Sequence, residues 1–268
     1  MTLAGCEGHG RVEQVVPAVP VRPQGGGRRR YGDRNVLAEI LFVAASGCTW
    51  RQTPEAVGPS WSTVYRRFAE WNQARVWAKL HRLVLDELGS QGELDWSRCA
   101  IDSVNMRALK GGNLTGPNPV DRGKKGSKIH LLTDRSGLPL SIGISAANTH
   151  DSLGLEPLVR GIPPIRSRRG PRRRRPAKLH ADKGYDYDHL RRWLRSRRIV
   201  PRIARKGVDS SARLGRHCWT VERTVSWLGG IRRLHRRYER KAEHFLAFAG
   251  IAATLFCYGR LTRGRPAR

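Results

Sequence analysis

The order of hydrophobic patterns between residues 98 and 203 constrains the fold more than any other feature of the sequence. Three short strand patterns come first, and a helix, a strand, a second helix and a last strand follow them. The expected strands are 99–104, 128–134, 139–145, 177–181 and 199–203, and the expected helices are 152–159 and 187–196. The first three strands, with tight connections, suggest an antiparallel meander. The whole order predicts an α/β fold, a mixed sheet with helices on its faces.

Three shorter helical patterns precede the sheet, at about 35–46, 61–71 and 76–88. The second begins after Ser60, a good N-cap, and places Trp61, Val64, Phe68 and Trp71 on one face. Its opposite face is polar and carries Ser62, Thr63, Arg66 and Arg67. This arrangement is typical of a helix-turn-helix DNA reader, and an ordinary three-helix packing module fits the pattern equally well.

Two long helices are expected to finish the chain, at about Trp219–Arg236 and Ala242–Leu261. On the first of them, Trp219 and Trp227 are expected in the core rather than as base-stacking platforms. The second is apolar on nearly every face, which burial against the sheet or a dimer interface explains equally. Its apolar stretch, 245–258, is shorter than the roughly 20 residues that cross a bilayer, so we expect a soluble cytoplasmic protein.

Acidic residues are scarce after residue 98, so their positions are informative. Asp102 lies in one apolar strand, Asp182 ends another, and Glu222 lies on an otherwise apolar helix pattern. A carboxylate on a buried strand is costly unless it is paired or bound to metal. Three such groups can hold two Mg²⁺ or Mn²⁺ ions for phosphoryl transfer. The alternative for each acid taken alone is a salt bridge with a neighbouring Arg98, Lys183 or Arg223.

The charge of the chain indicates a polyanionic partner. It has 51 Lys and Arg against 22 Asp and Glu, a formal net charge of +29. Nucleic acid is the commonest partner of such a surface. The densest basic segment, 165–176, directly precedes the strand that ends at Asp182, so we expect it at the mouth of the carboxylate site, holding the DNA backbone.

Several ordered motifs carry a resemblance to a known family. They are Ala100–Ser103, Gly126–His130, Ala147–Ser152, Ala181–Asp186 and Val221–Leu228. With their spacing they closely resemble the catalytic domain of bacterial insertion-sequence transposases of the DDE type, insertion sequence family five. The likeness runs from about residue 25 to the C-terminus.

The resemblance implies an RNase H-like catalytic core behind a helix-turn-helix-like domain. Asp102, Asp182 and Glu222 match the catalytic and metal-binding triad of the family. The implied activity is cut-and-paste transposition: binding of the terminal inverted repeats, metal-dependent phosphodiester hydrolysis, and strand transfer into target DNA. The implied partners are DNA and a second copy of the chain, on the nucleoid and without a membrane. The alternatives are a DNA-binding remnant that does not cut and an RNase H-like nuclease without strand transfer.

The expected organisation is a basic arm at 1–30, a helical DNA-binding domain at 31–92, a catalytic domain at 93–262 with its Arg-rich loop at 165–176, and a basic tail at 263–268. The expected DNA-binding residues are Arg28, Arg29, Arg30, Ser62, Thr63, Arg66, Arg67, Lys124, Lys125, Lys128, Arg172, Arg173, Arg174, Arg175, Arg223 and Arg233. The residues expected to support the triad are His130, Asp151, Lys183 and Asp186. Among these, Lys128 and His130 are expected near the scissile phosphate.

Overall fold

The structure is a computed structural model that describes residues 15–18, 31–54, 58–208 and 211–263, without the side chains of 211–219. Its centre is one mixed sheet. Six strands form it within the described part of the chain: β1 (Cys99–Arg107), β2 (Gly116–Pro117), β3 (Lys125–Asp134), β4 (Pro139–Ala146), β5 (Lys178–Ala181) and β6 (Val200–Ile203). The order is β2-β3-β1-β5-β6, with β4 also paired to β3.

Strand directions in this sheet are mixed, as the sequence predicts. β3 pairs antiparallel with both β1 and β4, whereas β5 pairs parallel with β1 and with β6. This is the RNase H-like sheet implied by the resemblance. The meander prediction holds for β3 and β4, but the connection from β1 to β3 spans 108–124 and includes β2, so it is not tight.

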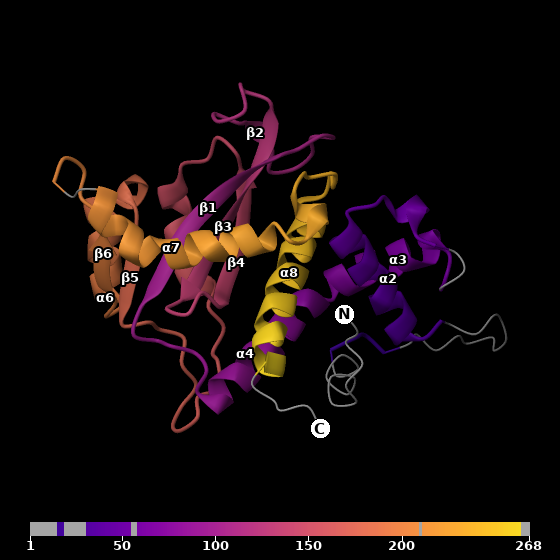
Figure 1. Cartoon of the computed structure of the whole chain (residues 1–268), viewed down its shortest axis with the longest axis horizontal. Helices are drawn as coiled ribbons and strands as arrows, with labels where there is room; N and C mark the ends of the chain where they lie inside the picture. Colours follow the sequence, from indigo (N-terminus) through magenta and orange to yellow (C-terminus); the bar gives the residue numbers. More distant parts are fainter. Residues whose placement is uncertain (1–14, 19–30, 55–57, 209–210, 264–268) are drawn as a thin grey trace.

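The described residues form seven α-helices. They are α2 (Asp33–Ser46), α3 (Trp61–Gln73), α4 (Val76–Gln91), α5 (Leu155–Gly161), α6 (Asp188–Ser196), α7 (Ser211–Leu228) and α8 (Ala242–Arg263). Four short 3₁₀ helices join them: η1 (Trp50–Gln52), η2 (Asp151–Gly154), η3 (Lys183–Tyr185) and η4 (Arg232–Leu234). In Figure 1, α7 crosses the sheet, and α2 and α3 lie beyond α8, away from the sheet.

Helix α7 differs from its predicted bounds of Trp219–Arg236. It begins at Ser211 and ends at Leu228, where Gly229 and Gly230 follow. Glycine costs about 1 kcal/mol relative to alanine inside a helix, so two in succession end it. Trp227 was expected in the core but is 42% exposed, with its ring against Phe256. The side chain of Trp219 lies outside the described residues.

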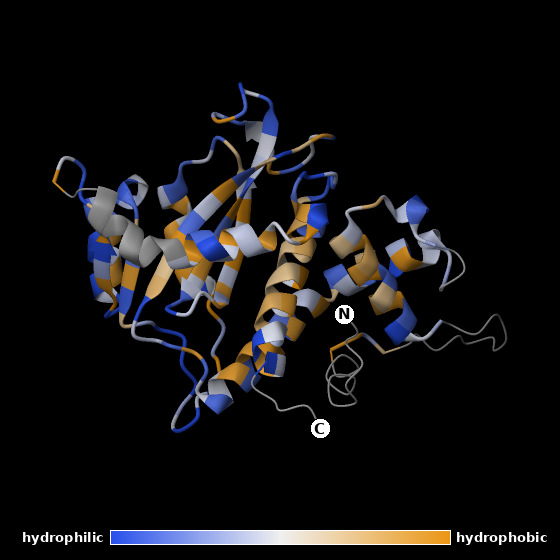
Figure 2. Ribbon diagram, in the orientation of Figure 1, coloured by the Kyte–Doolittle hydropathy of each residue, from blue (hydrophilic) through white to orange (hydrophobic). Residues whose placement is uncertain are grey.

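Helix α8 packs inside the molecule, against α4 and β4. Figure 2 shows the apolar residues along it. Its 22 residues are long and apolar enough to span a membrane, which differs from the expectation drawn from 245–258. Phe245, Phe248 and Ala253 are fully buried, so packing within the chain accounts for the apolar surface.

The N-terminal helices share a hydrophobic cluster with the sheet and α8. Phe68 of α3 stacks on Phe248 of α8 with ring centroids 5.0 Å apart, and Trp71 and Trp77 join the same cluster. Arg67, predicted on the DNA-facing surface of α3, is buried instead and forms an ion pair with Asp33 of α2. Its guanidinium therefore joins two helices, because a buried charge needs a partner.

Candidate active site and nucleic-acid surface

Asp102 and Asp182 lie side by side on neighbouring parallel strands. Ala100 of β1 pairs with His180 of β5, and each aspartate follows two residues later. Asp182 comes directly after β5, where its carboxylate accepts the N–H of Gly184 at 2.9 Å and caps η3. The carboxyl ends of parallel strands meet at one edge of a sheet, where functional groups of α/β proteins gather.

Glu222 reaches this region from a different element. It lies on α7, which crosses one face of the sheet and contacts β1, β3 and β5 (Figure 1). Val221 and Thr224 of α7 are buried beneath it, whereas Glu222 itself is exposed. The buried face of α7 thus fixes the helix and leaves the carboxylate at the surface.

The electrostatics show that these acids act on one another. The pKa of Asp102 is raised to about 6, mainly by burial and also by the negative charges of Asp182, Glu222 and Asp151, against a lowering hydrogen bond from the Ser103 N–H. Loss of solvation and the charge of Asp151 raise the pKa of Asp182 as well. The negative charges of Asp182 and Glu222 therefore act on Asp102.

Asp151, at the start of η2, is an acid near the site that two other side chains hold by hydrogen bonds. Its Oδ1 accepts hydrogen bonds from Ser103 Oγ at 2.7 Å and from Lys128 Nζ at 2.6 Å. Burial raises the pKa of Asp151, but these two bonds and the Lys128 charge outweigh it, so the pKa is lowered. Lys128 was expected at the scissile phosphate, but it is only 5% exposed and also donates to Thr149 O at 2.8 Å. Its described role is to hold Asp151.

The other predicted supporting residues occupy different positions. His130 is buried on β3 with Nε2 2.8 Å from Ser145 Oγ, and burial lowers its pKa to about 4, so the ring is neutral at pH 7. Asp186 accepts from Arg191 Nη2 at 2.6 Å and from the Lys206 N–H at 2.9 Å, which favours a structural role at the ends of α6 and β6. Lys183 begins η3, next to Asp182.

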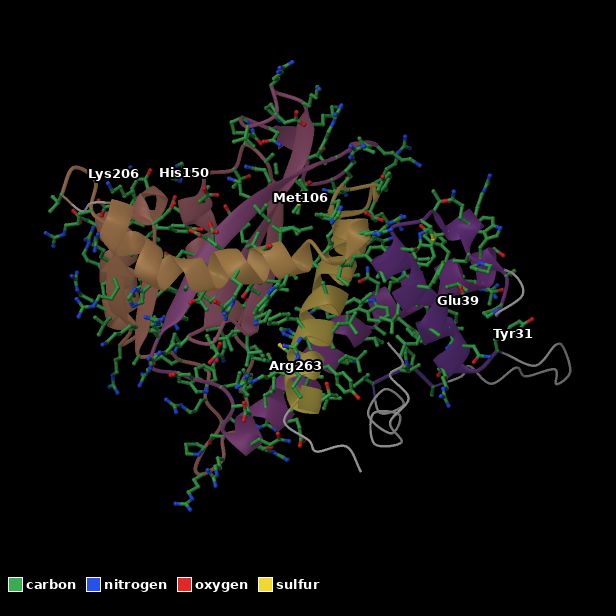
Figure 3. All side chains as sticks on the ribbon, viewed as in Figure 1. Tyr31, Glu39, Met106, His150, Lys206 and Arg263 are labelled. Carbon is green, nitrogen blue, oxygen red and sulfur yellow. The ribbon has the colours of Figure 1, made fainter. Side chains whose placement is uncertain are left out.

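The sequence reasoning missed Tyr185 and Ser103. The side chain of Tyr185 is 1% exposed, and its hydroxyl has no hydrogen-bond partner among the described residues. Burial and the charges of Asp151, Asp102 and Asp182 raise its pKa. Its position in the motif Ala181–Asp186 is the one signal that could have indicated it. Figure 3 labels His150 and Lys206, which lie near each other at the upper left of the view.

The donor set suits a divalent cation. Asp102, Asp182 and Glu222 offer carboxylate oxygens, the ligand type that Mg²⁺ and Mn²⁺ prefer. In the described part of the chain, no three Asp, Glu, His or Cys side chains lie closely enough together to enclose a metal ion. Burial is the main cause of the raised pKa of Asp102, and the other carboxylates add to it through the repulsion between like charges. A bound cation would remove this repulsion, so the three carboxylates fit a divalent cation.

Several predicted DNA-binding side chains reach the surface. Ser62, Arg66, Lys124 and Lys125 are exposed, and Thr63 is half-buried. Arg223 is half-buried, donates to Ser136 O at 3.1 Å and stacks over Trp227. Arg28, Arg29 and Arg30, with most of the arm at 1–30 and residues 264–268 of the tail, lie outside the described residues.

Arg233, in contrast, is buried at 5% exposure and paired with Glu239 at 2.8 Å. It also bonds Cys48 O across to the N-terminal helices. We therefore correct the expected DNA contact of Arg233, as we do for Arg67 and Lys128.

The Arg-rich loop is not at the mouth of the carboxylate site. It precedes β5 and so lies at the amino end of the strand whose carboxyl end leads to Asp182. Arg172 binds both carboxylate oxygens of Asp86 on α4, Arg173 stacks over Trp96, and Arg174 donates to Arg160 O. Arg175 is exposed. These contacts fix the loop on a different surface, next to the end of α4.

Two family profiles match the chain. One, described as "Transposase DDE domain", covers residues 96–257, which include the three acids. The other, described as "Putative transposase of IS4/5 family", covers residues 8–81. The match begins further toward the N-terminus than the likeness from residue 25.

Two curated relatives from Burkholderia cepacia are similar in sequence. The "Putative transposase for insertion sequence element IS402" is 45% identical over 149 residues, 56% of this chain and 71% of that protein. The "Insertion element IS402 uncharacterized 16.2 kDa protein" is 38% identical over 104 residues, 38% of this chain and 71% of that one.

Among solved structures, the Mos1 transposase paired-end complex with the left transposon end is 14% identical with a TM-score of 0.27. It matches over 92% of this chain and 86% of that one. The Mos1 mariner paired-end complex with Mn is 12% identical with a TM-score of 0.26, over 91% and 82%. At this similarity the neighbours do not define the fold, which rests on the sheet topology of the chain itself.

Proposed function

Because the chain belongs to the DDE transposase family and is a DNA transposase, we propose that it acts by cut-and-paste transposition at the terminal inverted repeats of its own element. In this proposal Asp102, Asp182 and Glu222 form the catalytic set. The protein hydrolyses a phosphodiester bond at each end and joins the freed 3′ hydroxyl to target DNA. Water is therefore the first nucleophile and the 3′ hydroxyl is the second.

One observation carries the assignment of the three residues. The pKa of Asp102 is raised by burial and then by the charges of Asp182 and Glu222, which come from another strand and from a helix. In a chain with 51 Lys and Arg and only 22 Asp and Glu, a surface carboxylate has many more basic than acidic side chains available as neighbours. A group of acids that repel one another, and so lower the stability of the folded protein, is typical of a functional site.

We assign Asp102, Asp182 and Glu222 as the residues that hold two divalent cations, Mg²⁺ or Mn²⁺. When bound, such ions activate the attacking oxygen and stabilise the leaving 3′ oxygen. Asp102 supplies its carboxylate in the ionised form at pH 7, since its pKa is about 6. Ser103 and Lys128 keep Asp151 oriented beside this set. Tyr185 is buried near these acids, whose charges raise its pKa.

The test is cleavage and joining of a labelled duplex that carries the element's own ends, with Mg²⁺ or Mn²⁺. We compare the natural protein with Asp102→Asn, Asp182→Asn and Glu222→Gln, and use Asp188→Asn as the control, because Asp188 is an exposed acid at the start of α6. Each triad variant is expected to bind the duplex normally and to lose cleavage by at least about 10³-fold. The control is expected to cut normally.

The outcomes separate the alternatives. A natural protein that binds the ends and never cuts is a DNA-binding remnant. Cleavage without joined products indicates a nuclease that lacks strand transfer. A triad variant that cuts normally removes that residue from the catalytic set.

The partners follow from the same proposal. DNA is the substrate at both the element ends and the target. Bringing two ends together requires at least two protomers, so we propose a dimer or larger assembly on DNA. The protein acts in the cytoplasm, bound to the nucleoid.

A further inference from the structure

A groove of about 1280 Å³ separates the N-terminal helices from the catalytic part of the chain. Its walls come from η1 and α3 on one side and from the end of β1, the start of β3 and residues 238–244 on the other. Figure 1 shows the loop that leads into α8 between these two parts. None of the three carboxylates assigned to catalysis lines it.

Arg237 holds together one wall of the groove, the wall formed by β1, β3 and residues 238–244. This guanidinium is fully buried and donates to Asn113 O, Leu114 O and Ser127 Oγ of the β2–β3 region, and to Glu239 O and Arg240 O of the segment before α8. Backbone bonds from Arg237 N to Arg107 O and from Asn113 N to Arg240 O join the same segments. These bonds fix the segments of this wall relative to one another without a ligand.

The lining is strongly basic. Six exposed side chains contribute to it: Arg107, Lys110, Lys124, Lys125, Arg240 and Lys241. Only Arg107 among them has a described ion pair, with Asp121 at 3.8 Å. The lining, as far as the structure describes it, contains one carboxylate, Glu239, and the buried Arg233 already neutralises it. Positive charge in this density complements a row of phosphates.

The wall formed by η1 and α3 is aromatic. Tyr65 is 38% exposed, Trp50 and Trp61 are half-buried, and the Trp50 and Tyr65 ring centroids are 5.5 Å apart. Bases of an intact duplex already stack on one another and offer no free face to such rings. Unpaired bases stack on aromatic side chains, at about 1–3 kcal/mol per base.

We propose that this groove binds an unpaired DNA strand, with its phosphates on the basic rim and a base against Tyr65. The inference rests on the proposed function, because a DNA strand that is released or unpaired near the cut is the ligand proposed for this groove. The groove then holds DNA at a place separate from the carboxylates.

The experiment measures fluorescence anisotropy of a labelled single strand, and of the duplex with its complement, in EDTA. Tyr65→Ala is expected to weaken single-strand binding by about fivefold to more than a hundredfold and to leave duplex binding unchanged. Tyr65→Phe keeps the ring and the affinity. Tyr31→Ala is the control, since Tyr31 is equally exposed at 39% and lies outside the groove.

Charge is tested by a second matched pair. Lys110→Ala with Lys125→Ala is expected to reduce the salt dependence of single-strand binding by about 0.7 for each phosphate that the protein no longer neutralises. Arg168→Ala with Arg169→Ala removes the same charge from the exposed Arg-rich loop and leaves this dependence nearly unchanged. Equal effects of the two pairs, or an unaffected Tyr65→Ala, would overturn the inference.

Asp102→Asn separates this inference from the proposed function. If it abolishes cutting while the groove variants bind single strands normally, the function stands and the groove inference fails. If the natural protein never cuts but the groove variants lose single-strand binding, the groove stands and the proposed function fails.

Discussion

Three arginines show how differently one residue type is used in this chain. Arg67, Arg233 and Arg237 are buried and bind carboxylates or carbonyl oxygens of distant segments. The planar guanidinium has five donors in a fixed fork, which suits such a junction. In a sequence with so many arginines, residue type alone does not distinguish a DNA contact from an internal brace.

We expect Arg237→Met to destabilise the protein by about 3 kcal/mol or more, because it leaves buried carbonyl oxygens without donors. Arg236→Met changes an exposed neighbour and is expected to stay within about 0.5 kcal/mol. Urea unfolding followed by circular dichroism measures both. Similar midpoints for the two variants would show that the Arg237 bonds contribute no net stability.

The carboxylates could be found from sequence because an acid on an apolar strand is conspicuous, as Asp102 is. Ser103 and Tyr185 could not be found in this way. A serine or tyrosine is common on any strand or in any core, and their proximity to the acids comes from contacts between distant segments.

Among the secondary-structure elements, strands were predicted more accurately than connections. The strand predicted at 128–134 lies within β3, which begins three residues earlier at Lys125 and is buried from residue 126 to residue 134. Predictions failed at the end of α7 and in the connection 108–124, which Arg237 organises. The path of that connection depends on bonds to a residue more than a hundred positions away, which no local pattern contains.

Close packing of α4 on the Arg-rich loop gives a prediction about glycine. A Cβ at Gly89 would lie 2.0 Å from Arg166 O, whereas a Cβ at Gly259 of α8 meets nothing within 4 Å. We expect Gly89→Ala to lower stability, because a steric cost of about 1–3 kcal/mol exceeds the gain in helix propensity. Gly259→Ala is expected to raise stability by up to about 1 kcal/mol. Thermal unfolding of both variants checks the sign, and a stabilised Gly89→Ala would contradict the packing.

The joint between α4 and β4 is expected to weaken in acid. His81 of α4 is buried with Nε2 3.0 Å from Pro139 O, and burial lowers its pKa to about 4, against the raising effect of that bond. A histidine whose folded pKa lies below its unfolded value of about 6.5 contributes fully above pH 6.5. That contribution is lost as the pH falls toward 4.

Between pH 7 and pH 5 we expect His81 to account for a loss of about 2 kcal/mol of unfolding free energy. His81→Gln keeps a donor for Pro139 O and does not titrate, so its stability is expected to fall less over this range. Urea titrations at both pH values measure the difference. Identical pH dependence in the two proteins would show that His81 keeps its ordinary pKa.

Across the whole molecule, the helical region and the sheet share one hydrophobic cluster, which includes Val36, Phe68, Ile129 and Phe248. The sequence predicted a helical unit at 31–92 before the catalytic unit, and it contained no sign of this shared core. Aromatic residues on a helix predict burial, and they do not specify which element covers them.

Because of the shared core, we expect α2–α4 and the sheet to unfold together. Native-state hydrogen exchange is expected to give similar opening free energies for amides of α3 and of β3. Exchange in α3 through a distinctly lower free energy would show that the helices unfold independently.

The order of strands in the sheet also determines when each part of the sheet can form as the chain leaves the ribosome. β3 can pair with β1, and β4 with β3, soon after they leave the ribosome, but the other edge of β1 waits for β5, and Glu222 emerges later still. Helix α8, which covers α4, comes last. A nascent chain therefore carries an incomplete set of carboxylates until almost all of it has been translated, and a polypeptide released before residue 222 lacks the third acid altogether.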